Sequence, residues 1–194
     1  MEVENNHLID YIKIYDDVFE KKVLKTFLKI CSEAKEFNEG MIVNSDGSKI
    51  KNKKVRDTLT WSPLNLIGTY TDAHWCCFLQ FTFNKYLTQY KEDLNLNLST
   101  KLTDIQILKY GNNGHYQFHV DHGAFISRTL SLIFLLNDEY EGGDLVFQNP
   151  TNKKEYKIDK KSNRIIIWPS TFLYPHGVSP VIKGTRYSVV AWAL

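Results

Sequence analysis

Two stretches in the first half of the chain carry apolar residues at helical spacing. In residues 18–37 the apolar positions recur every three or four residues, which predicts a helix with Asp16 or Asp17 as its N-cap. The same spacing returns in residues 72–94, where the first residue is again an aspartate suited to an N-cap. Each helix would have one apolar face, so both are expected to pack against another layer of structure.

The segments around these helices predict short strands and a loop. Residues 8–15 alternate apolar and polar positions, as a half-buried strand does, and residues 57–61 predict another short strand. Residues 44–54 are polar and basic and contain Asp46-Gly47, a dipeptide typical of turns. We therefore expect an exposed loop between the two helices.

The pattern changes from residue 102 onward. Short apolar runs alternate with breaks rich in glycine, asparagine and proline, the pattern of successive strands and turns. The runs span residues 103–110, 115–120, 128–137, 144–148, 155–158, 164–168, 176–182 and 185–193. Eight short strands predict a β-sandwich or barrel, with the two upstream helices packed on the outside of one sheet.

Length and composition favour one globular domain. The chain has 194 residues, of which 43% are hydrophobic and 24% charged, so it can bury a sizeable core as a single domain over residues 1–194. We expect an α+β fold that is mainly β, with helical support in residues 1–100 and a β core in residues 101–194. The three cysteines form no CxxC motif, which favours reduced thiols in the cytoplasm. No apolar stretch approaches the ~20 residues that span a bilayer, so no membrane partner is expected.

Charge argues against nucleic acid as the main partner. The formal net charge is only +2, and no basic stripe dominates the chain. Five basic residues do fall within residues 49–56. This cluster fits a solvated loop, and it also fits an edge that docks a substrate.

A histidine and an aspartate two positions apart, followed far downstream by a second histidine, indicate a metal site. His119 and Asp121 would project to the same face of a strand, because side chains alternate along a strand. His176 begins another apolar run, and strands distant in sequence can meet in a β core. Two imidazoles and one carboxylate form a face for Fe(II) that leaves positions open for a co-substrate and O₂. Zinc with a bound water would accept the same three ligands.

An arginine on the last predicted strand indicates an anionic ligand. Arg186 lies ten residues after His176, in a run that is expected to be buried. A buried guanidinium without an anion is unfavourable, and a carboxylate offers it two parallel hydrogen bonds. The distal carboxylate of a dicarboxylic co-substrate such as 2-oxoglutarate would meet this need, and Tyr110 could add a phenolic hydrogen bond. An internal pair with an Asp or Glu, and a purely structural tyrosine, are the alternatives.

These residues stand in motifs that resemble those of prolyl 4-hydroxylase-like Fe(II)/2-oxoglutarate dioxygenases. Residues 110–121 (YGNNGHYQFHVD) resemble the signature Tyr-Gly-x-Gly-Gly-x-Tyr-x-x-His-x-Asp. Residues 128–137 (RTLSLIFLLN) resemble the strand that follows it, and residues 141–147 (EGGDLVF) resemble the Glu-Gly-Gly-Glu-Thr-x-Phe element. Residues 176–188 (HGVSPVIKGTRYS) resemble the block from the distal histidine to the basic residue. The resemblance covers residues 104–193.

The resemblance implies a double-stranded β-helix (jelly-roll) core with N-terminal supporting helices. It implies that His119, Asp121 and His176 are catalytic ligands of Fe(II), with O₂ as oxidant and ascorbate as a candidate reductant. The implied activity is hydroxylation of a C–H bond, first of all in a prolyl residue of a peptide or protein, by a monomer or homodimer. The alternatives are hydroxylation of a free amino acid or other small molecule, and a non-catalytic module that binds a dicarboxylate.

The resemblance also implies how the co-substrate is held. Arg186, counted among the catalytic residues, would bind 2-oxoglutarate together with Tyr110 and Ser188. The chain departs from the family's pattern at Leu135, where many members carry a tyrosine that also touches the co-substrate.

Four further residues are expected on the substrate side. Arg128 and Trp192 match positions that line the substrate in some members of the family. Arg56 and Asp57 belong to a segment, RDTLTW, that resembles one in prolyl hydroxylases of the oxygen-sensing type. The resemblance therefore implies a peptide-binding surface built from both halves of the chain.

Overall fold

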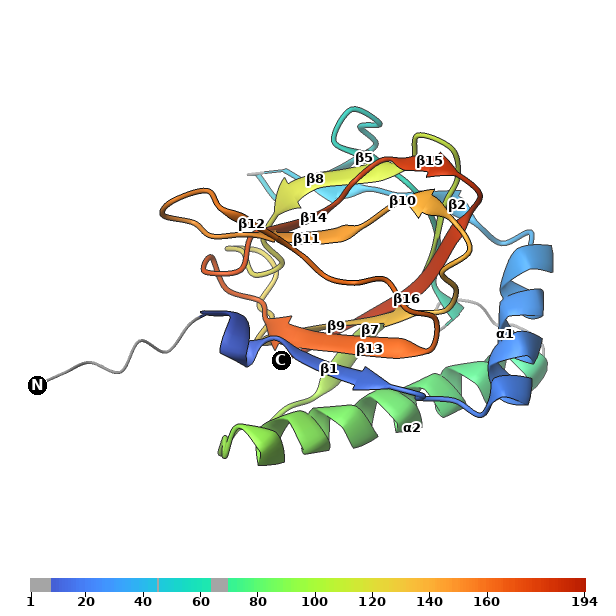
Figure 1. The fold of residues 1–194 in the computed structure, drawn as a ribbon, viewed down its shortest axis with the longest axis horizontal. Coiled ribbons are helices and arrows are strands. Elements are labelled where there is room, and N and C mark those ends of the chain that lie inside the picture. The colour runs from blue at the N-terminus through green and yellow to red at the C-terminus, as the bar shows by residue number, and fades with distance from the viewer. Residues whose placement is uncertain (1–7, 45, 64–69) are drawn as a thin grey trace, which may run out of the picture.

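Two antiparallel sheets face each other at the centre of the protein, and helices support the larger sheet from its outer side (Figure 1). The computed structural model describes residues 8–44, 46–63 and 70–194. In spatial order the larger sheet contains β1 (Lys13–Asp16), β13 (Arg164–Pro169), β9 (Leu130–Leu135), β16 (Arg186–Ala193), β7 (Leu102–Tyr110), β6 (Leu59–Trp61) and β2 (Asn38–Glu39). The smaller sheet contains β12 (Glu155–Lys157), β11 (Leu145–Gln148), β14 (His176–Val178), β8 (His115–His119) and β5 (Arg56–Asp57). This arrangement confirms the predicted double-stranded β-helix, an α+β fold that is mainly β.

Shorter elements complete the described part of the fold. Its helices are the 3₁₀ helix η1 (Leu8–Tyr11), α1 (Lys21–Glu33) and α2 (Tyr70–Asp93). Two further strand pairs join β10 (Glu141–Gly142) to β15 (Val181–Lys183) and β3 (Ile42–Val43) to β4 (Lys49–Ile50). None of the helices within these described ranges combines the length and the apolar character needed to cross a bilayer.

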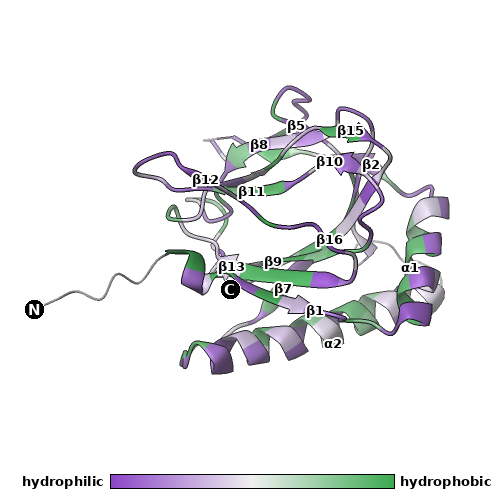
Figure 2. Cartoon of the chain, viewed as in Figure 1, coloured by the Kyte–Doolittle hydropathy of each residue, from purple (hydrophilic) through white to green (hydrophobic). Residues whose placement is uncertain are grey.

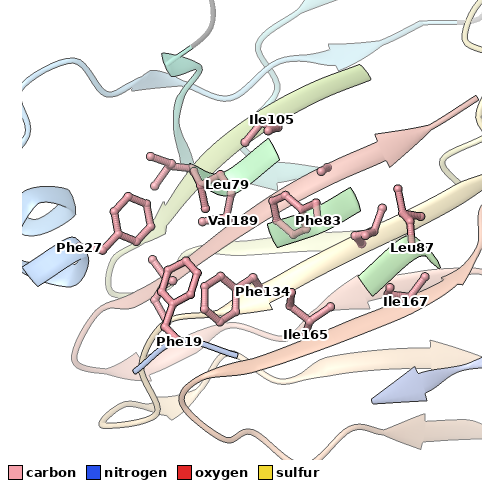
Figure 3. Close-up of a cluster of buried hydrophobic side chains, with 14 of the residues drawn as sticks. Phe19, Phe27, Leu79, Phe83, Leu87, Ile105, Phe134, Ile165, Ile167 and Val189 are labelled. Atoms are coloured by element: carbon pink, nitrogen blue, oxygen red, sulfur yellow. The ribbon is translucent and has the colours of Figure 1, made fainter. Parts of the chain in front are cut away.

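Side chains of the larger sheet alternate between its two faces, and each face has its own neighbours. The outward-facing set packs with α1 and α2 in one cluster (Figure 3). Its fully buried members include Phe27, Leu79, Phe83, Leu87, Ile105, Phe134, Ile165 and Val189. Hydrophobic and hydrophilic residues alternate along both helices, as expected for helices that bury one face (Figure 2). The helices therefore stabilise the outer face and leave the inner face of the sheet free for a site.

The first long helix lacks the aspartate cap that the sequence predicts. It begins at Lys21, and its N-cap position is Glu20, whose side chain makes no capping hydrogen bond. Asp16 instead ends β1 and binds Arg164. Asp17 adopts a φ of 54° where the chain turns away from the sheet. The predicted cap is wrong because the strand and the turn already use both aspartates.

Two other boundaries differ from the predicted ones. α2 begins two residues before Asp72, which therefore lies in the first turn, where a negative charge still favours the helix dipole. The predicted strand at residues 8–15 is a strand only in its second half, since only Lys13–Asp16 pair with β13. In the first half a 3₁₀ helix places Leu8 and Tyr11, three residues apart, on the same side, where both pack against the inner cluster.

The predicted strand at residues 57–61 is divided between the two sheets. β5 pairs with β8 in the smaller sheet, and β6 pairs with β7 in the larger one. Thr58 joins them, buried, with its hydroxyl donating to the carbonyl of Lys109 at 3.2 Å. Strands from the first part of the chain thus extend both core sheets, because each sheet edge offers unpaired backbone groups. The predicted division into helical support (1–100) and β core (101–194) is therefore not a clean one.

An ion pair between Asp16 and Arg164 joins β1 to β13. Because the carboxylate titrates, we expect the stability of the protein to depend on pH. Arg164 donates to both carboxylate oxygens of Asp16, at 2.7 and 3.0 Å, and Lys161 adds a third contact at 3.0 Å. The Arg164 hydrogen bond, with help from Lys161, lowers the pKa of Asp16 from 3.8 to about 2. The stabilisation is therefore complete above the unfolded pKa and is lost as the pH falls through the folded pKa.

Asp16→Asn is expected to lower the free energy of unfolding by no more than about 1 kcal/mol at neutral pH, because the pair is partly exposed and screened by salt. The deficit should shrink as the pH falls from the unfolded toward the folded pKa of Asp16. Denaturant unfolding curves measured across that range test this. Asp17→Asn removes an equal charge without breaking the Arg164 pair and serves as the control. A deficit that stays constant with pH would contradict the assignment.

A glycine allows the close approach of β10 to the residue that precedes β15. The predicted run at residues 176–182 is divided into β14 and β15 near Pro180, and β15 pairs with β10. Gly142 in β10 has a φ of +69°, and a Cβ there would collide with the carbonyl oxygen of Pro180. Only glycine combines this φ with such a close backbone approach.

Gly142→Ala is expected to lower the free energy of unfolding by more than about 2 kcal/mol, because it adds both φ strain and a clash with backbone. Gly111→Ala is the matched control, since a Cβ at Gly111 would meet nothing within 4 Å. The control should change stability by less than about 0.5 kcal/mol. Urea unfolding of both variants measures the difference, and equal stabilities would refute the steric explanation.

Candidate active site

Two histidines from neighbouring strands meet in the smaller sheet. The pairing of β8 with β14 sets His119 directly opposite His176, and Asp121 follows just beyond the end of β8. One potential ligand atom of each residue lies within 4.8 Å of the other two. The Nε2 atoms of His119 and His176 stand 3.6 and 3.4 Å from the two carboxylate oxygens of Asp121. The structure thus brings together the three residues that the sequence indicates as metal ligands.

A β-bulge in this strand pair changes which side chains face the cluster. His119 pairs with His176 and Tyr116 pairs with Val178, so β8 contains one residue more than β14 between the two pairs. Regular alternation would send Tyr116 and His119 to opposite faces. The extra residue places them on one face, with their rings stacked at 3.7 Å between centroids. The phenol of Tyr116 therefore packs against a candidate metal ligand.

Hydrogen bonds to backbone carbonyls decide which ring nitrogens face Asp121. Nδ1 of His119 lies 2.9 Å from the carbonyl oxygen of Gln117, and Nδ1 of His176 lies 3.1 Å from that of Tyr174. A carbonyl oxygen only accepts, so each Nδ1 carries a proton and donates it. In a neutral ring the free lone pair is then on Nε2, the nitrogen that a metal would bind.

His176 is enclosed by aromatic rings. Its ring centroid lies 4.9 Å from that of Trp168 and 5.7 Å from that of Phe147, and the residue is buried. Burial, reinforced by the nearby His119, lowers the pKa of His176 from 6.5 to about 4. The ring is therefore neutral at physiological pH, the form that binds a metal.

The carboxylate of Asp121 is ionised although it is buried. Burial by itself would raise its pKa, but the two neighbouring histidines and a hydrogen bond from Ser131 bring the pKa below its ordinary range. Ser131 donates to Oδ2 at 2.7 Å, and Nη1 of Arg128 lies 3.6 Å from Oδ1. The cluster therefore offers one anionic carboxylate oxygen beside two imidazole nitrogens.

This donor set fits Fe(II). Two imidazoles and one carboxylate on one side of the ion leave its other coordination positions to small molecules. Within the described residues no further His, Cys, Asp or Glu joins the cluster. Zinc accepts the same ligands, so the choice between the metals depends on the rest of the site.

A buried arginine lies on the larger sheet. Arg186 has no exposed surface; its Nη1 donates to Oγ of Ser188 at 2.9 Å, while its Nε and Nη2 have no partner among the described residues. Tyr110 is opposite Arg186 in the pairing of β16 with β7, with its ring centre 5.0 Å from the guanidinium carbon. In the described part of the chain no carboxylate binds these two nitrogens, and a carboxylate ligand fits them.

Tyr140 is a neighbour of this guanidinium that the sequence does not reveal. A Cβ on Gly143 would stand 3.0 Å from the Tyr140 ring and 3.2 Å from Cδ of Arg186, so the glycine leaves room for both. Burial raises the pKa of Tyr140, and the Arg186 charge opposes that rise. Leu135 lies opposite Ser188 in the pairing of β9 with β16 and adds no polar atom. Tyr140 thus places a phenol beside Arg186, although it lies between the motifs at residues 128–137 and 141–147.

Three of the four residues expected on the substrate side lie next to the metal-ligand cluster. The guanidinium of Arg56 is 4.8 Å from the centre of the Tyr116 ring, which stacks on His119. The guanidinium of Arg128 is 3.6 Å from the centre of the Trp192 ring. Trp192 is buried and reaches the cluster through Arg128.

Asp57, the fourth of these residues, is placed differently. In the register of β5 with β8, Arg56 is opposite Tyr116 and Asp57 is opposite His115. Consecutive strand residues face opposite sides, so Asp57 is directed away from Tyr116. The structure pairs Asp57 with His115 rather than with a residue of the cluster, and a substrate contact at Asp57 stays a prediction.

Sequence reasoning missed several residues that contact the candidate ligands directly or through one other side chain. Tyr116 stands inside the quoted signature, but strand alternation assigns it to the wrong face. Ser131 is a polar residue at an inward position of the otherwise apolar strand β9, which is a signal that could have identified it. Trp168 and Ser170 follow one another closely at the end of β13, and nothing in their spacing indicates that they reach the site.

Comparisons with known proteins agree with this geometry. Residues 105–194 match the model of the 2OG-Fe(II) oxygenase superfamily. A PKHD-type hydroxylase of Gloeothece citriformis is 33% identical over 98 residues, which cover 47% of this chain and 43% of that protein. The chain thus matches less than half the length of this curated relative.

Solved structures share the fold over more of the chain. A prolyl hydroxylase from Trichoplax adhaerens, in complex with a hypoxia inducible factor oxygen degradation domain peptide fragment, has a TM-score of 0.77 at 18% identity and covers 95% of this chain and 83% of that one. A Pseudomonas putida prolyl-4-hydroxylase has a TM-score of 0.70 at 15% identity and covers 95% and 96%. At these identities the solved structures show a shared fold only. The similarity to a family rests on residues 105–194. Over residues 105–194 the chain is thus similar to the 2OG-Fe(II) oxygenase superfamily, and over 98 residues it is similar to a PKHD-type hydroxylase.

Proposed function

We propose that this protein is an Fe(II)- and 2-oxoglutarate-dependent dioxygenase that hydroxylates a C–H bond in a prolyl residue of a peptide or protein. The observation that carries the proposal is a metal-ligand cluster in the same fold as a fully buried guanidinium with two unsatisfied N–H-bearing nitrogens. A 2-oxo dicarboxylate has one end suited to a metal and another suited to a guanidinium. A zinc hydrolase would leave Arg186 without a partner.

In this proposal the chain's residues divide into two binding sets. His119, Asp121 and His176 hold Fe(II), while Arg186 and Ser188 hold the distal carboxylate of 2-oxoglutarate. When bound, Fe(II) with 2-oxoglutarate and O₂ supplies the oxidising power that inserts one oxygen atom into a C–H bond, with succinate and CO₂ as co-products.

The surroundings of Arg186 strengthen the second set. The Tyr110 ring covers one side of the guanidinium, and Tyr140 lies beside it. Both residues are buried, so they keep water away from the carboxylate site. In such a low-dielectric site the attraction between guanidinium and carboxylate is stronger than in water.

A peptide substrate is supported by the comparisons and by the residues beside the cluster. The Trichoplax adhaerens prolyl hydroxylase was solved with a peptide fragment, and the curated relative is named a hydroxylase. Arg56, Arg128 and Trp192 would line the approach of a peptide to the metal. The basic segment of residues 49–56 would extend this surface.

The proposal is tested by incubating the protein with Fe(II), 2-oxoglutarate, O₂ and proline-containing peptides. We expect succinate release together with a mass gain of one oxygen atom on the peptide. Peptides with alanine in place of proline, and free L-proline, are the controls. Succinate release with free proline alone would assign a small-molecule substrate. Binding of 2-oxoglutarate without succinate release in any reaction would assign a non-catalytic dicarboxylate-binding module.

The proposal includes a cytoplasmic location, a monomeric or homodimeric state and ascorbate as reductant. Free thiols support a reducing compartment, since the described cysteines Cys31, Cys76 and Cys77 form no disulfide. Ascorbate dependence is tested by the number of turnovers with and without the reductant.

A further inference from the structure

The carboxylate of Asp121 is held by residues from outside the metal-ligand cluster. Ser131 in β9 places its Oγ 2.7 Å from Oδ2 of Asp121. Ser170, which directly follows β13, places its Oγ 2.7 Å from that of Ser131. Both serines are only 1% exposed. The hydroxyls of Ser170 and Ser131 therefore form a buried series of hydrogen bonds that ends on the Asp121 carboxylate.

The direction of this chain follows from the available donors. An ionised carboxylate only accepts hydrogen bonds, so Ser131 must donate to Asp121. The single hydroxyl proton of Ser131 is then used, and Ser170 must donate to Ser131. Ser170 is itself fixed by its backbone, since its N–H donates to Thr129 at 2.9 Å and its carbonyl accepts from His122 at 3.0 Å. Ser170 is thus a well-anchored donor at the start of the hydrogen-bond chain that ends on Asp121.

Arg128 acts on the other carboxylate oxygen. Its Nη1 lies 3.6 Å from Oδ1 of Asp121, which is too long for a good hydrogen bond but short for a charge interaction. The guanidinium is held over the Trp192 ring at 3.6 Å, and its Nη2 lies 4.0 Å from Asp104. The side chain of Arg128 is only 13% exposed, so water screens this charge weakly.

We infer that Ser131, Ser170 and Arg128 are positioning residues that orient the Asp121 carboxylate toward the metal, an inference that rests on the proposed function. Asp121 lies beyond the end of β8, where no strand pairing fixes its side chain. Ser131 holds one carboxylate oxygen and Arg128 attracts the other, which defines the rotation of the group. Outer partners of this kind typically change metal affinity by about 10- to 100-fold.

The affinity for metal in the absence of 2-oxoglutarate tests this inference. The dissociation constant is measured for Fe(II) under anaerobic conditions and for Mn(II) as a redox-stable probe. Ser131→Ala is expected to weaken binding by about 10- to 100-fold, and Ser170→Ala by less, because it removes only the donor to Ser131. Ser131→Thr keeps the hydroxyl on a residue suited to a strand and is expected to restore most of the affinity.

Arg128 provides an independent pair of variants. Arg128→Gln removes the charge and is expected to weaken metal binding by about tenfold, whereas Arg128→Lys keeps the charge and is expected to weaken it less. Asp104→Asn is the matched control, because Asp104 is largely exposed and lies near Nη2 of Arg128, whereas Asp121 lies near Nη1. It should leave the affinity unchanged.

Thermal unfolding of the metal-free variants separates orientation from general loss of structure. Metal-free Ser131→Ala and Arg128→Gln should unfold close to the wild-type temperature while binding metal more weakly. If Ser131→Ala does not fold, Ser170→Ala and Arg128→Gln decide the matter. A wild-type protein that binds neither metal would overturn the proposed function. Wild-type binding with unchanged affinity in Ser170→Ala and Arg128→Gln would overturn this inference alone.

Discussion

His176→Ala is expected to lower metal-dependent succinate formation by at least about 1,000-fold, equivalent to roughly 4 kcal/mol of transition-state stabilisation. His176 supplies one of the two imidazole nitrogens in the cluster, and the remaining His119 and Asp121 are too few to hold the ion. Initial rates at saturating Fe(II) and 2-oxoglutarate measure the loss. The absorption band of the anaerobic protein with Fe(II) and 2-oxoglutarate should disappear in the same variant.

His115→Ala is the matched control for this experiment. His115 lies on the same strand as His119, but its ring contacts the carbonyls of Asn113 and Lys54 rather than the cluster. Its succinate formation should stay within about twofold of wild type. Because His176 is buried, circular dichroism of the metal-free variant checks its folding, and the more exposed His119 provides a second variant, His119→Ala. Near-normal turnover in both ligand variants would refute the assignment of these histidines.

The second large effect is expected at Arg186. Arg186→Met should raise the KM for 2-oxoglutarate by about 100-fold or more, since each charged hydrogen bond to a buried carboxylate contributes roughly 1.5–3 kcal/mol. The metal-free protein should not lose stability, because the substitution removes a buried guanidinium with two unsatisfied nitrogens. Arg186→Lys should have a KM for 2-oxoglutarate between those of wild type and Arg186→Met, because an ammonium keeps the charge but not the planar shape of the guanidinium.

Two measurements separate a binding role of Arg186 from a structural one. Succinate formation against 2-oxoglutarate concentration gives the KM, and a 2-oxo acid without the distal carboxylate should serve wild type and Arg186→Met equally poorly. Thermal unfolding with and without 2-oxoglutarate should show ligand stabilisation in wild type and little in the variant. An unchanged KM combined with a large loss of stability would assign Arg186 to the core instead.

Long apolar runs made most of the β core predictable. The runs at residues 103–110 and 185–193 correspond to β7 and β16 within one residue at each end. β16 is buried along nearly its whole length, β7 has its buried apolar residues mainly in its second half, and turn residues adjoin both runs. Short elements were less predictable. The division of residues 57–61 at Thr58 depends on two different partner strands, and local alternation contains no information about partners.

The candidate ligands were also visible in the sequence, but their surroundings were not. The spacing of His119 and Asp121 indicated a metal site, and the position of Arg186 indicated an anion site. The structure places the three candidate metal ligands, His119, Asp121 and His176, together. Ser170, by contrast, reaches Asp121 through Ser131 across two sheets. Neither serine stands at a spacing that would connect it with the carboxylate.

By itself the sequence determined the apolar faces of the two helices, the succession of strands and the choice of chelating and cationic side chains, because all of these depend on residue type and on periodicity along the chain. Only the tertiary structure decided that a bulge in β8 turns Tyr116 onto His119, that Asp57 faces away from the cluster, and that Ser131 holds the carboxylate. These features depend on the register between strands far apart in the chain, and a shift of one residue in that register exchanges the faces of every side chain that follows.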